Sequence, residues 1–425
     1  MSFIRDAEVE AIIRTYATPL FKQAGVEPSA VQIHLVNSRE LNAFVADGLN
    51  LFLNTGLIVR TKSASELIGV IAHESGHIAG GHLLRGSTTA TNAGYEAIAA
   101  ALLGLAAGAA SGRGDIGGAV AAAGQDVAAR NYLAFSRSIE GTADTAALRF
   151  LDNLHQSSRG FLNFMETLAN QEGLQSSNQD PYVRTHPLTQ DRINEIRHHV
   201  DISQWSNATL PPEYEEMHAR LVAKLYAFLY SPAEALRKYP TTDNSIAGRY
   251  ARSIAAYRVP DLNRALPLID GLIAERPDDP YFHEFKGQVL YENQRLPEAI
   301  PEYQKAAKLK PDNSLIRTEL GTAEIASEDP GAMKDAAENL RFATHAEPDN
   351  AEAWLQLSSA YAHLENDPLA EAALAEYSYL AGKWAEAIFH ADRAAKALPK
   401  GTPVELRMED LRVVAEQERD KAKNR

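Results

Sequence analysis

Cysteine is absent from this 425-residue chain, which excludes thiol chemistry and a disulfide framework. Basic residues are also outnumbered, because 42 Lys and Arg stand against 56 Asp and Glu and leave a formal net charge of -14. Nucleic-acid binding needs clustered positive charge, so we expect no nucleic-acid partner. The apolar content of 45% is ordinary for a globular protein, and the length predicts two or three mostly helical domains.

A long apolar segment is missing as well. Residues 1–8 start in helical periodicity and lack a basic region followed by an apolar run, so they contain no recognisable export signal. Residues 97–112 form an uncharged stretch rich in Ala and Gly, which is shorter than the roughly 20 residues that cross a bilayer. We expect this insertion, about residues 87–125, to form a lid over a functional site. A peripheral membrane contact is the alternative.

The chain does contain the run HESGH at residues 73–77, a pattern typical of zinc proteases. On a helix, His73 and His77 share one face with their Cβ atoms about 5 to 6 Å apart, so both can bind one ion. Glu74 lies to the side of this face. It is therefore poorly placed as a ligand but well suited to be the general base that removes a proton from water.

The helix that this motif requires is predicted by the residues before it. Ser63, followed three residues later by Glu66, reads as a capping box, and an apolar segment, residues 67–71, comes next. The alternative is an amphipathic helix that carries two histidines by chance, because so short a pattern also occurs without function. A third metal ligand would favour the zinc-protease interpretation.

Two acidic residues downstream are candidates for the third ligand, since catalytic zinc has three protein ligands and one open position. Glu140 and Asp144 are four residues apart within residues 133–151, whose apolar spacing is helical. One carboxylate could bind the metal while the other orients a ligating histidine. Their spacing does not say which residue has which role.

A different zinc class, the metzincins, needs a histidine ten residues after the first one. This chain has Leu83 at that position, and His82 lies one position early. On a continuous helix His82 would lie about half a turn around from His73 and would point away from the metal. We interpret His82 as a packing or surface residue.

A small sheet is predicted before the motif. Residues 31–36 read as a strand, and residues 42–46 pair with residues 49–53 across Asp47-Gly48, a strong hairpin signal. Zinc endopeptidases hold an extended substrate against the edge of such a sheet by backbone hydrogen bonds. A purely structural hairpin is the alternative. The predicted substrate-binding residues are Asn42, Ala43, Phe44 and Val45.

The second half of the chain has the small, aromatic and proline positions of the tetratricopeptide repeat. Gly321 repeats Gly287 after 34 residues, whereas Pro348 follows Pro311 by 37, which predicts a small insertion near residues 328–331. The 51 residues between Pro348 and the next repeat proline predict an extra helix within residues 368–380. The matching residues of the first clear repeat are Gly287, Ala299, Tyr303, Ala306 and Pro311.

These patterns predict two domains separated by the linker-like residues 203–212. Residues 1–205 would form an α+β zinc metalloprotease domain, mostly helical with a small β-sheet. Residues 206–425 would form an all-α tetratricopeptide-repeat superhelix, whose concave face commonly binds a protein or a peptide. The alternative is a stabilising appendage that only docks on the first domain.

The chain resembles the HtpX-like gluzincin peptidases in four places. These are the HESGH run, Glu140 with Asp144, residues 42–44 with the hairpin that follows them, and Thr185-His186-Pro187. The chain is most similar to a soluble bacterial envelope group of that family, in which the protease domain is joined to tetratricopeptide repeats. The resemblance covers most of the chain. It implies that His73, His77 and Glu140 bind one zinc ion (Zn2+) and that Glu74 is the base.

The resemblance implies roles for three further residues. Asp144 would support a ligating histidine from behind. His186 corresponds to an additional histidine near the metal, which would stabilise the oxyanion or cap the resting zinc. Arg192, six residues after His186, corresponds to an arginine close to the same site.

From the resemblance we expect a periplasmic zinc endopeptidase that cleaves misfolded or stalled envelope proteins, with the repeats recruiting substrates. The start of the chain would then lie at or near the mature N-terminus. An outer-membrane assembly machine is an expected partner of the repeats. The alternative function is a repeat-based chaperone or scaffold in outer-membrane protein assembly whose metal site is rarely active.

Overall fold

The computed structural model describes residues 2–46, 49–81, 137–172, 186 and 188–423. Its contacts divide the chain into two compact units, Met1–Tyr230 and Ser231–Arg425, and each is described here by itself. No helix in the described part is long and apolar enough to cross a membrane. The predicted lid, His82 and the turn at residues 47–48 lie outside the described residues.

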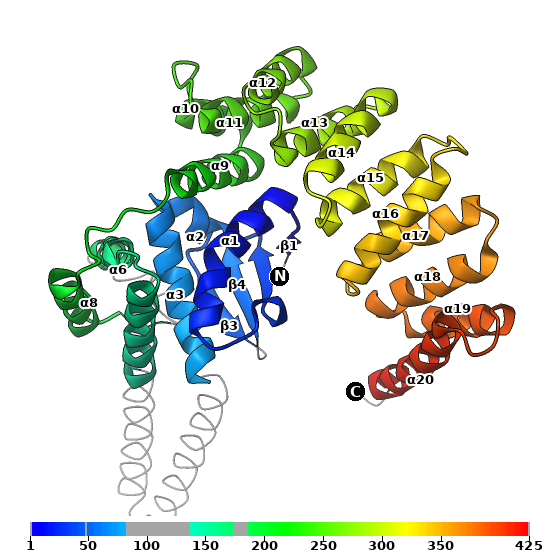
Figure 1. Ribbon diagram of the computed structural model, residues 1–425, viewed down its shortest axis with the longest axis horizontal. Coiled ribbons are helices and arrows are strands. Elements are labelled where there is room, and N and C mark those ends of the chain that lie inside the picture. Colours follow the sequence, from blue (N-terminus) through cyan, green and yellow to red (C-terminus); the bar gives the residue numbers. More distant parts are fainter. Residues whose placement is uncertain (1, 47–48, 82–136, 173–185, 187, 424–425) are drawn as a thin grey trace, which may run out of the picture. The chain divides into compact units, whose positions relative to one another are not determined.

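A four-stranded sheet opens the first unit (Figure 1). Three of its strands were predicted from the sequence, whereas β1 lies within residues 1–8, which were read as helical from their start. It consists of β1 (Phe3–Ile4), β2 (Gln32–Val36), β4 (Asn50–Asn54) and β3 (Ala43–Ala46), in that spatial order. β2 and β4 are parallel, and the other two pairs are antiparallel. The predicted hairpin is confirmed by the pairing of β3 with β4, and it leaves β3 at one edge of the sheet.

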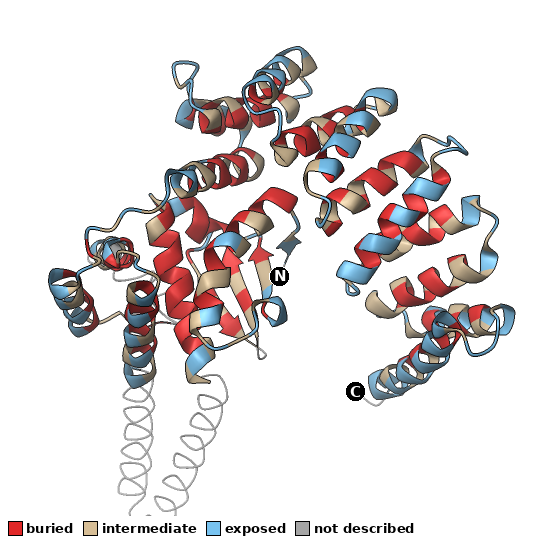
Figure 2. Cartoon of the chain, in the orientation of Figure 1, coloured by how far each residue is buried: buried red, intermediate tan, exposed pale blue. Residues whose placement is uncertain are grey.

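Helices cover one face of this sheet, and the most central of them carries the HESGH run. This helix, α3, is buried over most of its length (Figure 2), because its apolar residues pack against α1, α6 and β3. A further helix spans residues 137–153. The labelled α-helices of the unit are α1 (Ala7–Gln23), α2 (Thr55–Arg60), α3 (Ala64–Gly80), α6 (Arg159–Glu172), α8 (Gln190–Ile202) and α9 (Pro212–Leu229). A short 3-10 helix, η1 (Pro28–Ala30), follows α1.

The start of α3 follows the predicted cap in part. The Ser63 side chain accepts a hydrogen bond from the Glu66 amide at 3.3 Å, as an N-cap does. The Glu66 carboxylate, however, accepts from the Lys62 amide at 2.8 Å and not from Ser63 as in a capping box. Gly81, with φ at +58°, ends the helix in the left-handed region.

Helix α9 belongs to the first unit, although the sequence analysis placed the domain boundary before it, at residues 205 and 206. Buried Glu8 of α1 pairs with two buried cations of α9, lying 2.5 Å from Arg220 and 3.4 Å from Lys224. A buried charge that loses its partner is strongly destabilising, so these pairs hold α9 against α1. Isolated charged residues have no periodic signal in the sequence. The sequence analysis therefore placed the boundary one helix too early.

The second unit is a series of antiparallel helix pairs. Gly287 of α13 faces the ring of Tyr303 of α14, and a Cβ on the glycine would lie 2.9 Å from that ring. The predicted insertion is confirmed, because the loop at 327–332 is longer than the equivalent loop at 293–295. An extra helix is present between Pro348 and Pro399, but its predicted place within residues 368–380 is wrong. There α18 follows α17 after three residues, as α14 follows α13, and is the second helix of a regular pair, so the extra helix is α19. The helices are α10 (Pro232–Lys238), α11 (Ile246–Tyr257), α12 (Leu262–Glu275), α13 (Pro280–Glu292), α14 (Leu296–Leu309), α15 (Ser314–Ala326), α16 (Met333–Ala346), α17 (Ala351–His363), α18 (Asp367–Leu380), α19 (Trp384–Ala397) and α20 (Pro403–Lys423).

Candidate metal and catalytic site

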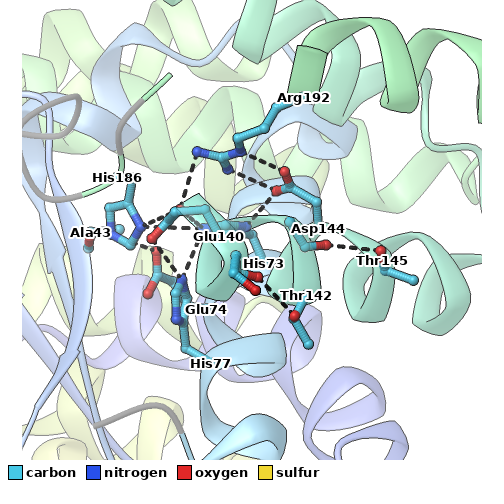
Figure 3. A network of polar contacts seen from close by, with 12 residues as sticks. Ala43, His73, Glu74, His77, Glu140, Thr142, Asp144, Thr145, His186 and Arg192 are labelled. Carbon is cyan, nitrogen blue, oxygen red and sulfur yellow. Dashed lines mark hydrogen bonds and ion pairs between the residues drawn. The ribbon is translucent and has the colours of Figure 1, made fainter. Parts of the chain in front are cut away.

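Four segments that are distant in sequence meet in the interior of the first unit (Figure 3). Helix α3 contributes the two histidines and the glutamate of the HESGH run. Helix 137–153 contributes the two carboxylates, His186 lies in the segment that leads into α8, and Arg192 lies in the first turn of α8. The edge strand β3 reaches the site through the backbone of Ala43.

A cluster of four buried side chains forms the centre of the site, with one potential ligand atom from each lying within 4.8 Å of all the others. Nε2 of His73 lies 3.1 Å from Nε2 of His77 and 3.2 Å from Nδ1 of His186. The carboxylate of Glu140 lies 3.3 Å from His73, 3.5 Å from His77 and 3.2 Å from His186. Such convergent nitrogen and oxygen atoms are the donor set that zinc prefers.

Close packing between α3 and helix 137–153 brings these groups together. A Cβ added at Gly76 would lie only 2.6 Å from the carbonyl oxygen of Ala143, so a side chain at position 76 would push the helices apart. Sequence reasoning missed this role of Gly76. The signal that could have found it is the glycine itself. Inside a helix glycine costs about 1 kcal/mol relative to alanine, so its presence there points to a packing requirement.

The structure distinguishes the positions of the two carboxylates that the spacing left open. Glu140 faces the cluster, whereas Asp144 lies on the far side of His73, with Oδ1 2.9 Å from Nδ1. Arg192 holds Asp144 with two hydrogen bonds, from Nε at 2.6 Å and from Nη2 at 2.8 Å. A third Arg192 nitrogen, Nη1, lies 3.1 Å from Glu140, so one guanidinium contacts both carboxylates.

The carboxylates and the cations in this cluster shift one another's pKa values. Burial opposes the ionisation of both carboxylates, but hydrogen bonds from His186 and His73 hold the pKa of Glu140 well below its ordinary value. Arg192 and His73 outweigh burial in the same way and lower the pKa of Asp144. For His73, burial lowers the pKa, yet Asp144 and Glu140 raise it to about 10. The electrostatics therefore favour a positive charge at the centre of the cluster.

Glu74 differs from the other acidic groups of the site. It is completely buried, and neither of its carboxylate oxygens accepts a hydrogen bond from any residue that the structure describes. Burial raises its pKa, while the neighbouring His186 and His73 act in the opposite direction. A buried carboxylate with a raised pKa and unused acceptor capacity is suited to exchange protons with a water or a substrate.

His186 connects the cluster to the edge strand. Its Nε2 lies 3.1 Å from the carbonyl oxygen of Ala43, which can only accept, so Nε2 carries the hydrogen. The other ring nitrogen, Nδ1, faces His73 and Glu140. It donates to Glu140 when the ring is protonated and carries the lone pair when the ring is neutral. Nε2 also lies 3.5 Å from Glu74.

The predicted residues divide into two sets. The structure brings the histidines, the acidic residues and Arg192 into one cluster, and Ala43 adjoins it. Among the predicted substrate-binding residues, the backbone carbonyl of Asn42 accepts a hydrogen bond from the backbone amide of Asn54 in β4, so this carbonyl faces β4. Because backbone groups alternate along an antiparallel strand, Phe44 also pairs with β4, and Ala43 and Val45 direct theirs to the outer edge.

The fold and the site define a metallopeptidase domain followed by a tetratricopeptide-repeat unit. Residues 4–200 match peptidase family M48, and residues 250–314 and 331–379 match the tetratricopeptide repeat. Residues 4–200 are therefore a peptidase family M48 domain, and the C-terminal unit contains tetratricopeptide repeats.

Relatives match most of the chain. The beta-barrel assembly-enhancing protease of Yersinia pestis is 25% identical over 391 residues, which are 91% of this chain and 79% of that protein. The protein of the same name from Escherichia coli (strain K12) is 24% identical over 409 residues, 91% of this chain and 78% of that protein. Among solved structures, the tetratricopeptide-repeat protein YrrB matches 41% of this chain and 91% of its own, with 18% identity and a TM-score of 0.34.

Proposed function

We propose that this chain is a zinc-dependent endopeptidase of the gluzincin type. The observation that carries the proposal is the buried cluster of His73, His77 and Glu140, with the unsatisfied carboxylate of Glu74 beside it. Two histidines and a glutamate form a common ligand set of catalytic zinc, and a nearby glutamate that is not a ligand suits the general base.

Zinc bound by His73, His77 and Glu140 would polarise the scissile carbonyl and make a water acidic enough to attack at neutral pH. Glu74 accepts the proton that this water loses and later donates it to the leaving amine. Asp144 contacts the nitrogen of His73 that faces away from the cluster, which fixes the tautomer and the orientation of the ring. Arg192 acts through Asp144 and Glu140 as a positioning residue.

His186 has two roles in this proposal, one at rest and one during the reaction. At rest its Nδ1 would be available to a bound zinc as a fourth donor beside the three ligands. An extended substrate that pairs with the Ala43 carbonyl displaces the hydrogen bond from His186. The freed imidazole then lies close enough to the reacting carbonyl to donate a hydrogen bond to the oxyanion.

The substrates that we propose are misfolded or stalled envelope proteins, cleaved in the periplasm. This proposal follows the relatives, which are named for enhancing beta-barrel assembly. The second candidate function is a chaperone or scaffold in outer-membrane protein assembly with a rarely active metal site. One observation favours it. His186 lies against His73 at 3.2 Å, where it would keep a bound metal capped.

The recruitment of substrates or of an assembly partner is assigned to a groove in the repeat unit. The groove has a volume of about 1170 Å³ and lies between α16, α17, α18 and α20. Apolar and aromatic side chains line it, among them Trp354 and Tyr361, and charges of both signs, including Arg341 and Glu338, lie among them. A concave surface of this kind suits an extended protein segment with apolar side chains.

Replacing Trp354 by alanine is expected to raise KM for an unfolded substrate about tenfold with kcat nearly unchanged, because the groove binds the substrate and the transition state equally. The matched control is Phe389→Ala, which removes an aromatic side chain that is 55% exposed and does not line the groove. An unchanged KM in the Trp354 variant would refute recruitment through this groove.

Removing the metal with a chelator is expected to abolish casein cleavage, and adding zinc should restore it. The midpoint of thermal unfolding should fall as well, since a ligand at 100 times its Kd stabilises the folded state by about 2.7 kcal/mol. Metal analysis of the purified protein accompanies the assay. If the zinc-loaded protein cleaves no unfolded chain, the chaperone or scaffold function is favoured instead.

A further inference from the structure

We propose that Phe44 selects substrates that place an aromatic side chain beside the cleaved bond. The proposal rests on the proposed function and names a determinant of its specificity. It depends on a row of aromatic rings that crosses the outer face of the sheet and ends at the edge strand β3. This row, called the aromatic row below, consists of Phe3, His34, Phe52 and Phe44.

The rings of the aromatic row contact one another from one edge of the sheet to the other. Phe44 of β3 stacks on Phe52 of β4 with 4.8 Å between centroids and 9° between ring planes. Phe52 stacks on His34 of β2 at 4.7 Å, and Phe3 of β1 lies 5.7 Å from His34. Asn50 fixes the His34 ring through a contact of 2.8 Å with Nε2.

The aromatic row lies on the side of the sheet opposite to the helices that the structure describes in this unit. Side chains alternate between the two faces of a strand, and Val45, Leu51 and Leu53 are buried in the core beneath the helices. Phe44 and Phe52 are therefore on the opposite face, where they are only half-buried, and Phe3 is 51% exposed.

The register of β3 determines where a paired substrate would place its side chains. Asn42 and Phe44 use their backbone groups to pair with β4, so Ala43 and Val45 offer theirs to a strand added at the outer edge. In an antiparallel addition, the substrate residue opposite Phe44 forms the pair without mutual hydrogen bonds, in which the side chains are closest. Its side chain then lies on the same face as Phe44.

An aromatic residue at this substrate position continues the aromatic row by one ring. Cross-strand aromatic pairs contribute about 0.5 to 1.5 kcal/mol beyond the area that they bury, which corresponds to about a two- to tenfold preference. The position is next to the chemistry, because the carbonyl of the adjacent Ala43 contacts His186, and His186 contacts Glu140. Phe44 therefore affects the choice of the cleaved bond as well as general affinity.

The test is a cleavage-site profile of casein, determined by mass spectrometry with zinc-loaded full-length protein. The wild type should show Phe, Tyr and Trp enriched at one fixed position relative to the cleaved bond. The wild type should cleave a peptide with Phe at that position with a kcat/KM about two- to tenfold higher than the same peptide with Ala there, and Phe44→Ala should abolish this ratio. The control is Phe3→Ala, at the other end of the aromatic row, which should leave the enrichment unchanged.

A second variant keeps the test decisive if Phe44→Ala unfolds. Phe44→Leu preserves apolar volume, so it should fold, cleave casein and lose the aromatic enrichment. The proposal is overturned if the wild type cleaves casein without aromatic enrichment, or if either Phe44 variant retains the enrichment. A zinc-loaded wild type that cleaves nothing would instead contradict the proposed function itself.

Discussion

Replacing Glu74 by glutamine is expected to reduce casein cleavage by about 10²- to 10⁴-fold, the usual contribution of a general base. The amide has nearly the shape of the carboxylate but cannot accept a proton. Glu74 is completely buried, and its oxygens receive no hydrogen bond from the described residues, so the substitution removes little structural support. Zinc content, measured by metal analysis, should stay close to that of the wild type, because Glu74 lies outside the proposed ligand set.

The matched control is Glu195→Gln, which makes the same chemical change on the exposed face of α8 in the same unit. It should cleave casein at the wild-type rate. Binding of unfolded substrate by the repeats should persist in Glu74→Gln, which separates recruitment from cleavage. A Glu74→Gln protein that keeps more than about a tenth of the wild-type rate would contradict the assignment of Glu74 as base.

Replacing Arg192 by alanine is expected to lower the free energy of unfolding by about 3 to 5 kcal/mol, the cost of leaving buried charges unpaired. Its guanidinium binds Asp144 through two nitrogens at 2.6 and 2.8 Å and contacts Glu140 at 3.1 Å. Removal would leave two buried carboxylates without their shared cation. We also expect weaker zinc binding, since Asp144 and Glu140 would no longer be held in position. Urea denaturation and metal analysis measure the two effects.

Arg197→Ala is the control for this change, because Arg197 is on the same helix as Arg192 and the substitution also replaces an arginine by alanine. Arg197 pairs with Glu166 at 2.8 Å, but both side chains are about two-fifths exposed, so the loss should be below about 1 kcal/mol. Arg192→Lys should recover only part of the lost stability, because an ammonium keeps the charge but not the planar fork. Equal effects of the two alanine variants would refute the role of Arg192 as the buried cation of the site.

The sequence predicted the parts of the site that depend on spacing within one helix. His73 and His77 lie four residues apart on α3, and Ser63 caps that helix as expected. The hairpin of β3 and β4 and the loop insertion in the repeats were also predicted, since turn residues and repeat periods are local signals. Glu140 and Asp144 were found as candidates, but helical spacing is the same for both residues and could not separate their positions.

By itself, then, the sequence of this protein determined its helices, its hairpin, its repeat period and the four-residue spacing of the two histidines. Only the tertiary structure decided that Glu140 faces the histidine cluster while Asp144 lies behind His73, and that Arg192 holds both. It also placed α9 in the first unit through buried charge pairs with Glu8. Periodic patterns report which face of an element is apolar, whereas these contacts join single polar side chains from distant segments, and such contacts form only when the chain is folded.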